Sequence, residues 1–250
     1  MGTDIHLWVE KKSGNGWEIV KGIDYVELDF YTKALEENRE KSAGSYYSHL
    51  DEEYLLKRIE ETKQPQEEWA YNGRNYNLFA ILADVRNGIG FAGIKTGEGF
   101  NPISKPRGVP KDASDYYLQE VDYWDGDGHS HSYHTLKQLK EYDWNQETVQ
   151  YGVIPENYYK ELKESGENPE MWSGEVSGRN IKVISSDEMD RILEGTLPRE
   201  EGIEYYVQMK WGIKYHETCG SFYDQTIPAL EELSEDGVGE DVRIVFFFDN

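Results

Sequence analysis

The chain ends in a stretch that is apolar at six of seven positions, Val242-Arg-Ile-Val-Phe-Phe-Phe248. A nearly continuous apolar run is typical of a central strand that is covered on both faces of its sheet. Near the other end, residues 3–10 alternate, with Ile5, Leu7 and Val9 on one face, which predicts a half-buried strand. We therefore expect an α+β fold whose mixed β-sheet holds the N- and C-terminal strands in central or adjacent places, with helices packed on it.

The chain between these two strands contains helix signals, shorter strands and one long loop. Residues 88–110 are rich in glycine and proline, and their apolar side chains predict an ordered loop laid over the core. At 250 residues, we expect one α+β domain over 1–250, with variable insertions at about 29–63 and 145–178. Helices are predicted over 29–63, from Asn75 or Asn77 to Arg86, and over 135–142, 185–193 and from 226; strands are predicted at 17–20, 181–184, 205–215 and 242–248.

The composition restricts the classes of partner. The formal net charge is −23, so nucleic acids and anionic membrane surfaces are repelled over most of the surface. Cys219 is the only cysteine, which excludes an intramolecular disulfide and suits a reducing compartment. No apolar run approaches the length of a membrane span, and the N-terminus lacks a signal-peptide pattern. We expect a cytoplasmic protein without a nucleic-acid or membrane partner.

Residues 73–111 form a cationic island in this acidic chain. The island carries six cationic side chains and two anionic ones, together with seven glycines. A local positive charge on a glycine-rich backbone suits a small anionic ligand. The cations are Arg74, Arg86, Lys95, Lys105, Arg107 and Lys111, and the anions are Asp84 and Glu98.

The island also contains a G-x-G-x-x-G string from Gly88 to Gly93. In a dinucleotide-binding fold this string follows a strand and opens a helix, whereas here it follows a predicted helix. We therefore reject the dinucleotide fold. The backbone N–H groups of the string and the Lys95 ammonium could instead line an anion site.

Two further clusters contain groups that serve in catalysis or metal binding. Asp4 and His6 lie two residues apart on a predicted strand, and His129, His131 and His134 follow a turn-forming segment at 125–132. No cofactor is predicted firmly, but Asp4 and His6 could share a divalent metal with the later histidines. The structural alternative is that Asp4 and His6 bond a neighbouring loop, while the later histidines lie at the surface.

Four blocks of sequence are long and specific: MGTDIH at 1–6, GRNYNLFA at 73–80, TGEGFNP at 96–102 and DGHSHS at 127–132. Together with a final strand that ends Phe-Asp-Asn, they resemble an uncharacterised family of phage and prophage proteins that open with M-G-x-D-I-H. The resemblance implies an accessory protein in the cytoplasm of an infected bacterium. By analogy with other phage proteins, it also implies an anti-defence role against nucleotide signals of bacterial immunity.

Three functions follow from these patterns. The first is a homo-oligomeric sponge that binds and sequesters a small phosphate-bearing nucleotide, such as a cyclic dinucleotide or a cyclic ADP-ribose species. The second is a metal- or His-dependent phosphodiesterase that cleaves such a signal. The third is an acidic mimic of DNA that inhibits a basic host protein.

The predicted ligand site joins residues 73–107 to residues 129–134. Cations are expected to bind phosphates, amides to read polar edges, and aromatic rings to stack on a base. The ligand-binding candidates are Arg74, Asn75, Tyr76, Arg86, Lys95, Thr96, Phe100, Asn101, Arg107 and His134; the candidate catalytic residues, if the protein is an enzyme, are His129 and His131, and the metal candidates are Asp4 and His6.

Overall fold

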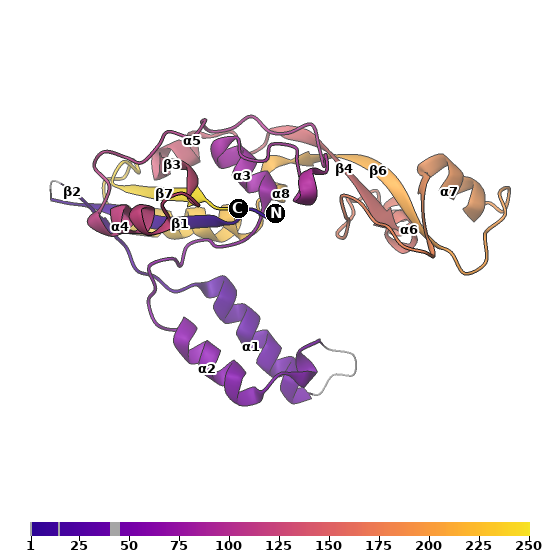
Figure 1. Ribbon diagram of the computed structural model, residues 1–250, viewed down its shortest axis with the longest axis horizontal. Helices are drawn as coiled ribbons and strands as arrows, with labels where there is room; N and C mark the ends of the chain where they lie inside the picture. The colour runs from indigo at the N-terminus through magenta and orange to yellow at the C-terminus, as the bar shows by residue number, and fades with distance from the viewer. Residues whose placement is uncertain (1, 15, 41–45) are drawn as a thin grey trace. The chain divides into compact units, whose positions relative to one another are not determined.

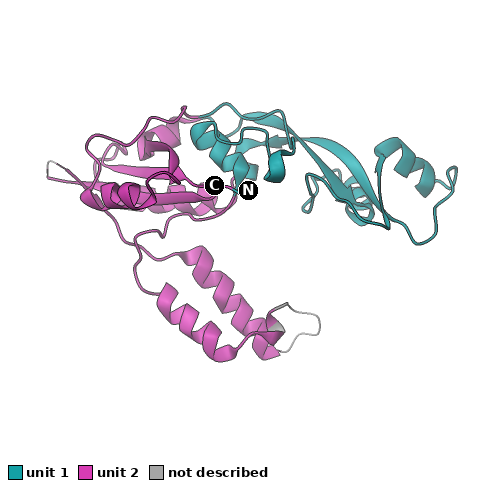
Figure 2. Ribbon diagram, in the orientation of Figure 1, with its two compact units in different colours: residues 1–2, 75–102, 143–218 teal, residues 3–74, 103–142, 219–250 magenta. Residues whose placement is uncertain are grey.

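The computed structural model describes residues 2–14, 16–40 and 46–250, and these form two compact units (Figure 2). Unit 1 contains Gly2 and residues 75–102 and 143–218, and unit 2 contains residues 3–74, 103–142 and 219–250. Each unit has both helices and strands, so the expected α+β class is confirmed. The assignment of all 250 residues to one domain stays a prediction.

Unit 2 is built on a four-stranded antiparallel sheet in the order β2-β1-β7-β3 (Figure 1). The strands are β1 (Ile5–Ser13), β2 (Gly16–Ile19), β3 (His129–Thr135) and β7 (Val242–Phe248). Every residue of β7 is buried, and β7 pairs along its length with β1. The expected pairing of the first and last strands is thus confirmed, and the apolar run predicted the centre of this sheet correctly.

Both faces of this sheet are covered. On one face, helix α4 (Asp115–Trp124) places Tyr117 against Trp8 of β1 and Phe247 of β7. Helices α5 (Leu136–Glu141) and α9 (Ile227–Leu233) contact β7, and a π-helical turn, η3 (Phe222–Thr226), leads into α9. The prediction that β1 is half-buried is wrong, because Trp8 and Glu10 on its second face are also buried. Alternation alone could not reveal this cover, since it comes from a helix more than a hundred residues away.

Strand β3 lies where the sequence predicted a turn and no strand. The predicted turn at 125–132 ends at Gly128, and His129 already pairs with Phe248 of β7. A bulge between His129 and Ser132 interrupts the register, and Ser130 has a φ of 54°. A bulge adds one unpaired residue to a strand, which explains how a sequence typical of turns enters this sheet.

A helical hairpin completes unit 2. The predicted helical region at 29–63 consists of α1 (Tyr25–Glu40), the short 3-10 turn η1 (Tyr46–His49) and α2 (Glu52–Thr62). Helices α1 and α2 pack through a small core of Ala34, Leu35, Leu55 and Ile59.

Unit 1 contains a mixed three-stranded sheet in the order β4-β6-β5, with β4 and β6 antiparallel and β5 and β6 parallel. Its strands are β4 (Glu147–Pro155), β5 (Ile181–Ser185) and β6 (Glu204–Lys214). Helices α6 (Glu156–Ser165) and α7 (Ser186–Leu193) pack on one face through Tyr159 and Met189. Strand β4 and helix α6 fall within residues 145–178, where no helix or strand was predicted.

The remaining elements of unit 1 are α3 (Tyr76–Ala83), the 3-10 turn η2 (Phe91–Gly93) and α8 (Tyr215–Thr218). Helix α3 ends three residues before the predicted end, because Asp84 adopts a left-handed conformation with a φ of 59°. No helix in the described part of the chain is long and apolar enough to cross a membrane.

Candidate functional site

The residues of the predicted ligand site are divided between the two units. Asn75 to Asn101 belong to unit 1, while Arg74, Arg107 and the histidines of β3 belong to unit 2. The island divides unevenly: residues 75–102 carry two cations and two anions, whereas residues 103–111 carry three cations and no anion. The positive excess therefore lies in unit 2, in Arg74 and in residues 103–111.

In unit 1, most of the predicted ligand-binding side chains serve the fold. Asn75 caps α3, because its Oδ1 accepts hydrogen bonds from the backbone N–H groups of Asn77 and Leu78, both at 3.1 Å. Phe100 is buried and lies edge-on to the Tyr215 ring, with centroids 4.9 Å apart. Thr96 is also buried.

The other candidates of unit 1 also contact protein groups. Asn101 donates a hydrogen bond from Nδ2 to Gln146 Oε1 at 2.9 Å. The Arg86 guanidinium lies 4.9 Å from the centre of the Tyr76 ring, so these two candidates form a cation–π contact with each other. Lys95 is exposed, 3.5 Å from Glu98 and 5.2 Å from the Tyr151 ring centre.

The G-x-G-x-x-G segment forms a small hairpin and does not open a helix of a nucleotide-binding fold. Gly90 N donates to Ile94 O at 2.8 Å, and Thr96 N donates to Gly88 O at 2.9 Å. Gly88 has a φ of +72°, and a Cβ there would lie 2.9 Å from the carbonyl oxygen of Gly97. Glycine is therefore required at position 88 by a close backbone approach.

In unit 2, one end of the sheet brings together blocks that are far apart in the sequence. Arg74 donates from Nε and Nη2 to the two carboxylate oxygens of Asp4, at 2.6 and 2.5 Å. The pKa of Asp4 lies below its usual value, chiefly because of the hydrogen bond from Arg74. Asp4 N donates to Asp249 Oδ1 at 3.0 Å, so both chain ends meet here. The two candidates Asp4 and Arg74 are thus partners of each other.

His6 lies in the same region between two carboxylates. Its Nδ1 is 3.3 Å from Glu68 Oε1, and its Nε2 is 3.5 Å from Asp249 Oδ2. Nε2 is buried, and at 3.5 Å from Asp249 Oδ2 it forms no short hydrogen bond with that carboxylate. Burial lowers the pKa of His6, but Glu68 and Asp249 together outweigh burial and raise it above its usual value. His6 also packs against Trp124, with ring centroids 4.2 Å apart.

The histidines of β3 also have partners within the protein. His129 Nε2 lies 3.0 Å from Asn250 Nδ2, and its Nδ1 lies 3.0 Å from Ser130 Oγ. The His131 ring packs on Phe247 at 4.9 Å, and burial lowers its pKa despite a hydrogen bond to the Gly128 backbone. His134 is fully buried. These contacts support a structural role for the histidines, although His134 does not lie at the surface as the structural alternative expected.

The metal candidates have no suitable geometry. Within residues 2–14, 16–40 and 46–250, no group of three or more His, Cys, Asp or Glu side chains is arranged to hold a metal ion. The Asp4 carboxylate is already bound by Arg74. A metal ion beside His6 would have to compete with its imidazole for the carboxylates of Glu68 and Asp249.

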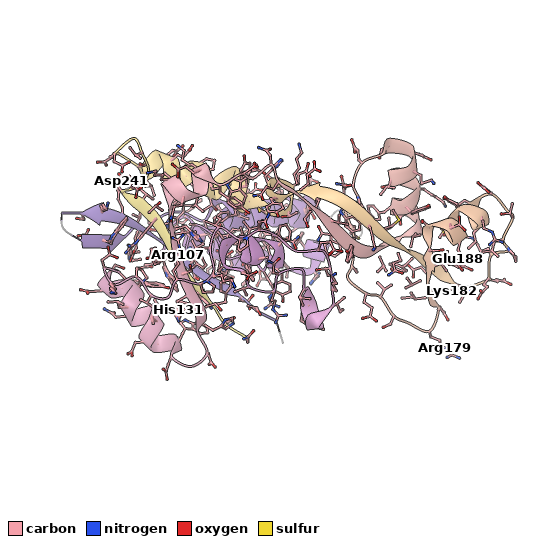
Figure 3. All side chains as sticks on the ribbon, turned by 90° about the horizontal axis from the view of Figure 1, so that it is seen from above. Arg107, His131, Arg179, Lys182, Glu188 and Asp241 are labelled. Atoms are coloured by element: carbon pink, nitrogen blue, oxygen red, sulfur yellow. The ribbon has the colours of Figure 1, made fainter. Side chains whose placement is uncertain are left out.

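The cationic part of unit 2 is a segment that runs along the outer edge of β3. Gly108 N donates to His131 O at 2.8 Å, and Arg107 Nη1 donates to Tyr133 O at 3.0 Å. We call residues 103–111 together with β3 the cationic strip; Figure 3 labels Arg107 and His131 on its two segments. The segment covers the unpaired edge of β3, which protects the sheet from edge-to-edge association.

Three exposed cations of the cationic strip have no carboxylate partner in the described part of the chain: Lys105, Arg107 and Lys111. The Arg107 guanidinium lies 5.4 Å from the centre of the Tyr133 ring, and its Nη1 also donates to Gln138 Oε1 at 2.9 Å. These contacts hold the guanidinium in place and leave Nε and Nη2 without a hydrogen bond among the described residues. A fixed guanidinium with two such donors can bind a phosphate in a bidentate manner.

Sequence reasoning missed the groups that position these side chains. Glu68 and Asp249 raise the pKa of His6, while Tyr133 and Gln138 orient Arg107. Two of these groups carried a signal: Asp249 belongs to the Phe-Asp-Asn ending of the resemblance, and Gln138 stands at capping-box spacing from Thr135. Comparison of the chain with protein-family models, with curated proteins and with solved structures finds no match.

Proposed function

We propose that the protein binds and sequesters a small phosphate-bearing nucleotide at the cationic strip. The observation that carries this proposal is that three exposed cations without carboxylate partners lie within seven residues, on a segment hydrogen-bonded to β3. In a chain with a net charge of −23, this local potential attracts a small anion, while the rest of the surface repels a large one.

The proposed contacts follow from the geometry of the strip. Arg107 binds one phosphate through Nε and Nη2, and Lys105 and Lys111 contribute ammonium groups to the same or a second phosphate. The cyclic dinucleotides and cyclic ADP-ribose species of bacterial immunity carry two phosphates, which suits several separate cations. The resemblance to phage proteins makes these signals the first ligands to test, and an anti-defence role in the cytoplasm of an infected cell belongs to the same proposal.

Hydrolysis of the bound nucleotide is the alternative, but the site supports it less well. A general base needs a nitrogen that faces the substrate. The His131 ring is instead hydrogen-bonded to the Gly128 backbone, and its Nδ1 lies 3.5 Å from the Tyr117 hydroxyl.

A homo-oligomer would enclose a ligand at the exposed strip. Light scattering with and without ligand tests that part of the proposal.

The experiment is a thermal-shift panel of cyclic dinucleotides and ADP-ribose derivatives, followed by recovery of the ligand. Ligand at 100 times its Kd should stabilise the protein by about 2.7 kcal/mol, which raises Tm by several degrees. We expect a shift that disappears in Arg107→Gln, and intact nucleotide after heat denaturation. A lower-mass product would support hydrolysis instead. If no member of the panel shifts Tm, binding of this ligand class is refuted.

A further inference from the structure

The two outer edges of the sheet in unit 1 differ in how they are covered. Along β4, Glu98 N donates to Val149 O at 3.0 Å and Tyr151 N donates to Thr96 O at 2.8 Å, so a loop covers that edge. Strand β5 forms the other edge, because the order of the sheet is β4-β6-β5. In the described part of the chain, no backbone group from outside the sheet is hydrogen-bonded to residues 182–184. One edge of this sheet is therefore closed and the other is open.

The open edge presents the backbone of Val183. Glu204 N donates to Asn180 O at 2.8 Å, which shows that the Asn180 carbonyl points toward β6. In a parallel pair, alternate residues direct their N–H and C=O groups to the neighbouring strand. Lys182 and Ile184 therefore also face β6, while Val183 directs its N–H and C=O outward. Val183 is 41% exposed, so its outward backbone groups are accessible to another strand.

Strand β5 itself lacks the devices that usually protect an edge strand. It has five residues, the ordinary length of a strand, and its sequence contains no proline. Its register with β6 is continuous, without a bulge. Its only charged side chain, Lys182, is bonded to the Glu200 carboxylate, which offsets the charge. Nothing within β5 therefore opposes pairing with a further strand.

Charges of opposite sign stand at the two ends of β5. Arg179 precedes the strand and Asp187 follows it; both are exposed, and neither has an ionic partner among the residues that the structure describes. Figure 3 labels Arg179 near one end of β5 and Glu188, the neighbour of Asp187, near the other. Each of the two lies four residues from Val183 (183 − 179 = 187 − 183 = 4). An antiparallel pair of β5 strands centred on Val183 thus brings Arg179 of each copy beside Asp187 of the other.

We propose that β5 pairs antiparallel with β5 of a second copy of this chain, around a two-fold axis at Val183. The N–H of each Val183 donates to the C=O of the other, and the strands of both copies form one continuous sheet. Two symmetric ion pairs between Arg179 and Asp187 fix the register. The pairing goes beyond nucleotide binding and does not require it, because β5 belongs to unit 1 and the cationic strip to unit 2.

The test is sedimentation velocity of the full chain without nucleotide, at concentrations up to about 100 μM. We expect the unchanged chain to dimerise. Arg179→Asp brings two carboxylates together at each end of the strand pair, and Asp187→Arg brings two guanidinium groups together there. Each variant should therefore weaken dimerisation by at least about tenfold. A chain that stays monomeric at the highest concentration would overturn the proposal.

The two variants combined test the two-fold geometry. Arg179→Asp/Asp187→Arg should dimerise like the unchanged chain, because each ion pair is restored with its signs exchanged. An equimolar mixture of the two single variants should form a mixed dimer, since their charges are complementary at both contacts. A mixture that remains monomeric would contradict the antiparallel register.

Matched controls and hydrogen exchange locate the contact. Lys57→Asp and Asp122→Arg change the net charge by the same amounts in unit 2 and should leave dimerisation unchanged. Amide exchange in peptides that contain Val183 should slow as the concentration rises, because the outward N–H becomes hydrogen-bonded. Equal weakening by the controls, or unchanged exchange at Val183 in the dimer, would overturn the proposal.

Discussion

The buried ion pair between Glu10 of β1 and Arg243 of β7 offers a stringent test of how unit 2 is held together. The Glu10 side chain is fully buried, and that of Arg243 is 4% exposed. Glu10 accepts hydrogen bonds from Arg243 Nε and from Ser114 N, both at 2.7 Å. One carboxylate therefore joins two adjacent strands to the residue that caps α4.

Replacing Glu10 with Gln keeps the volume but removes the charge opposite Arg243. Loss of one partner of a buried pair costs about 3–5 kcal/mol, because the remaining charge stays buried. Asp112 still contacts Arg243 Nη1 at 2.9 Å, so we expect a value near the lower end, about 3 kcal/mol. The matched control is Asp112→Asn. The Asp112 side chain is 64% exposed, and its loss should cost at most about 1 kcal/mol.

The assay is urea unfolding at pH 7, with hydrogen exchange of β1 and β7 peptides as the probe for unit 2. Glu10→Gln should lower the free energy of unfolding by at least twice as much as Asp112→Asn. Equal effects of the two variants would refute the reasoning, because they would show that burial of the pair does not decide its contribution.

Three smaller predictions concern single side chains. Asn75→Ala should destabilise unit 1 by about 1–2 kcal/mol in urea unfolding, because two N–H groups of α3 lose their acceptor; an unchanged midpoint would argue against the cap. The folded-state pKa of His6 is raised by Glu68 and Asp249, so its contribution is fully present below the unfolded pKa and is lost as pH rises through the folded pKa. Stability should therefore fall as pH rises above about 6.5, and His6→Gln should flatten that part of the profile; an equally steep profile would contradict the assignment. Ala92 is exposed and has a φ of 56°, a left-handed conformation that is strained for alanine but not for glycine. Ala92→Gly should therefore raise the free energy of unfolding by up to about 1 kcal/mol, and a lower Tm would show that the Ala92 backbone is not strained.

Local signals in the sequence were reliable where the physics is local. Thr135 with Gln138 and Ser185 with Glu188 have the sequence spacing of a capping box, and both boxes are present in the structure. The nearly continuous apolar run at residues 242–248 predicted a central strand, because such a run is typical of a strand covered on both faces.

The remaining features depend on tertiary contacts that no local pattern contains. The second face of β1 is buried by α4, and β4 forms in a polar segment because it pairs with β6. The closeness of its cations in the sequence predicts that the island is one site. The structure assigns its halves to different units, since the chain passes from unit 1 to unit 2 after Pro102.

Binding of a nucleotide at the cationic strip is the central proposal, and a charge-matched comparison tests it most directly. Equilibrium dialysis with a cyclic dinucleotide or cyclic ADP-ribose species that shifts Tm is carried out on two triple variants. Lys105→Gln/Arg107→Gln/Lys111→Gln removes the cations of the strip, while Lys57→Gln/Lys63→Gln/Lys160→Gln removes three exposed cations elsewhere. Both variants lower the net charge by the same amount, so any general electrostatic effect is equal. We predict that only the strip variant loses binding, by at least about a hundredfold. Equal affinity of the two variants would contradict the proposed site.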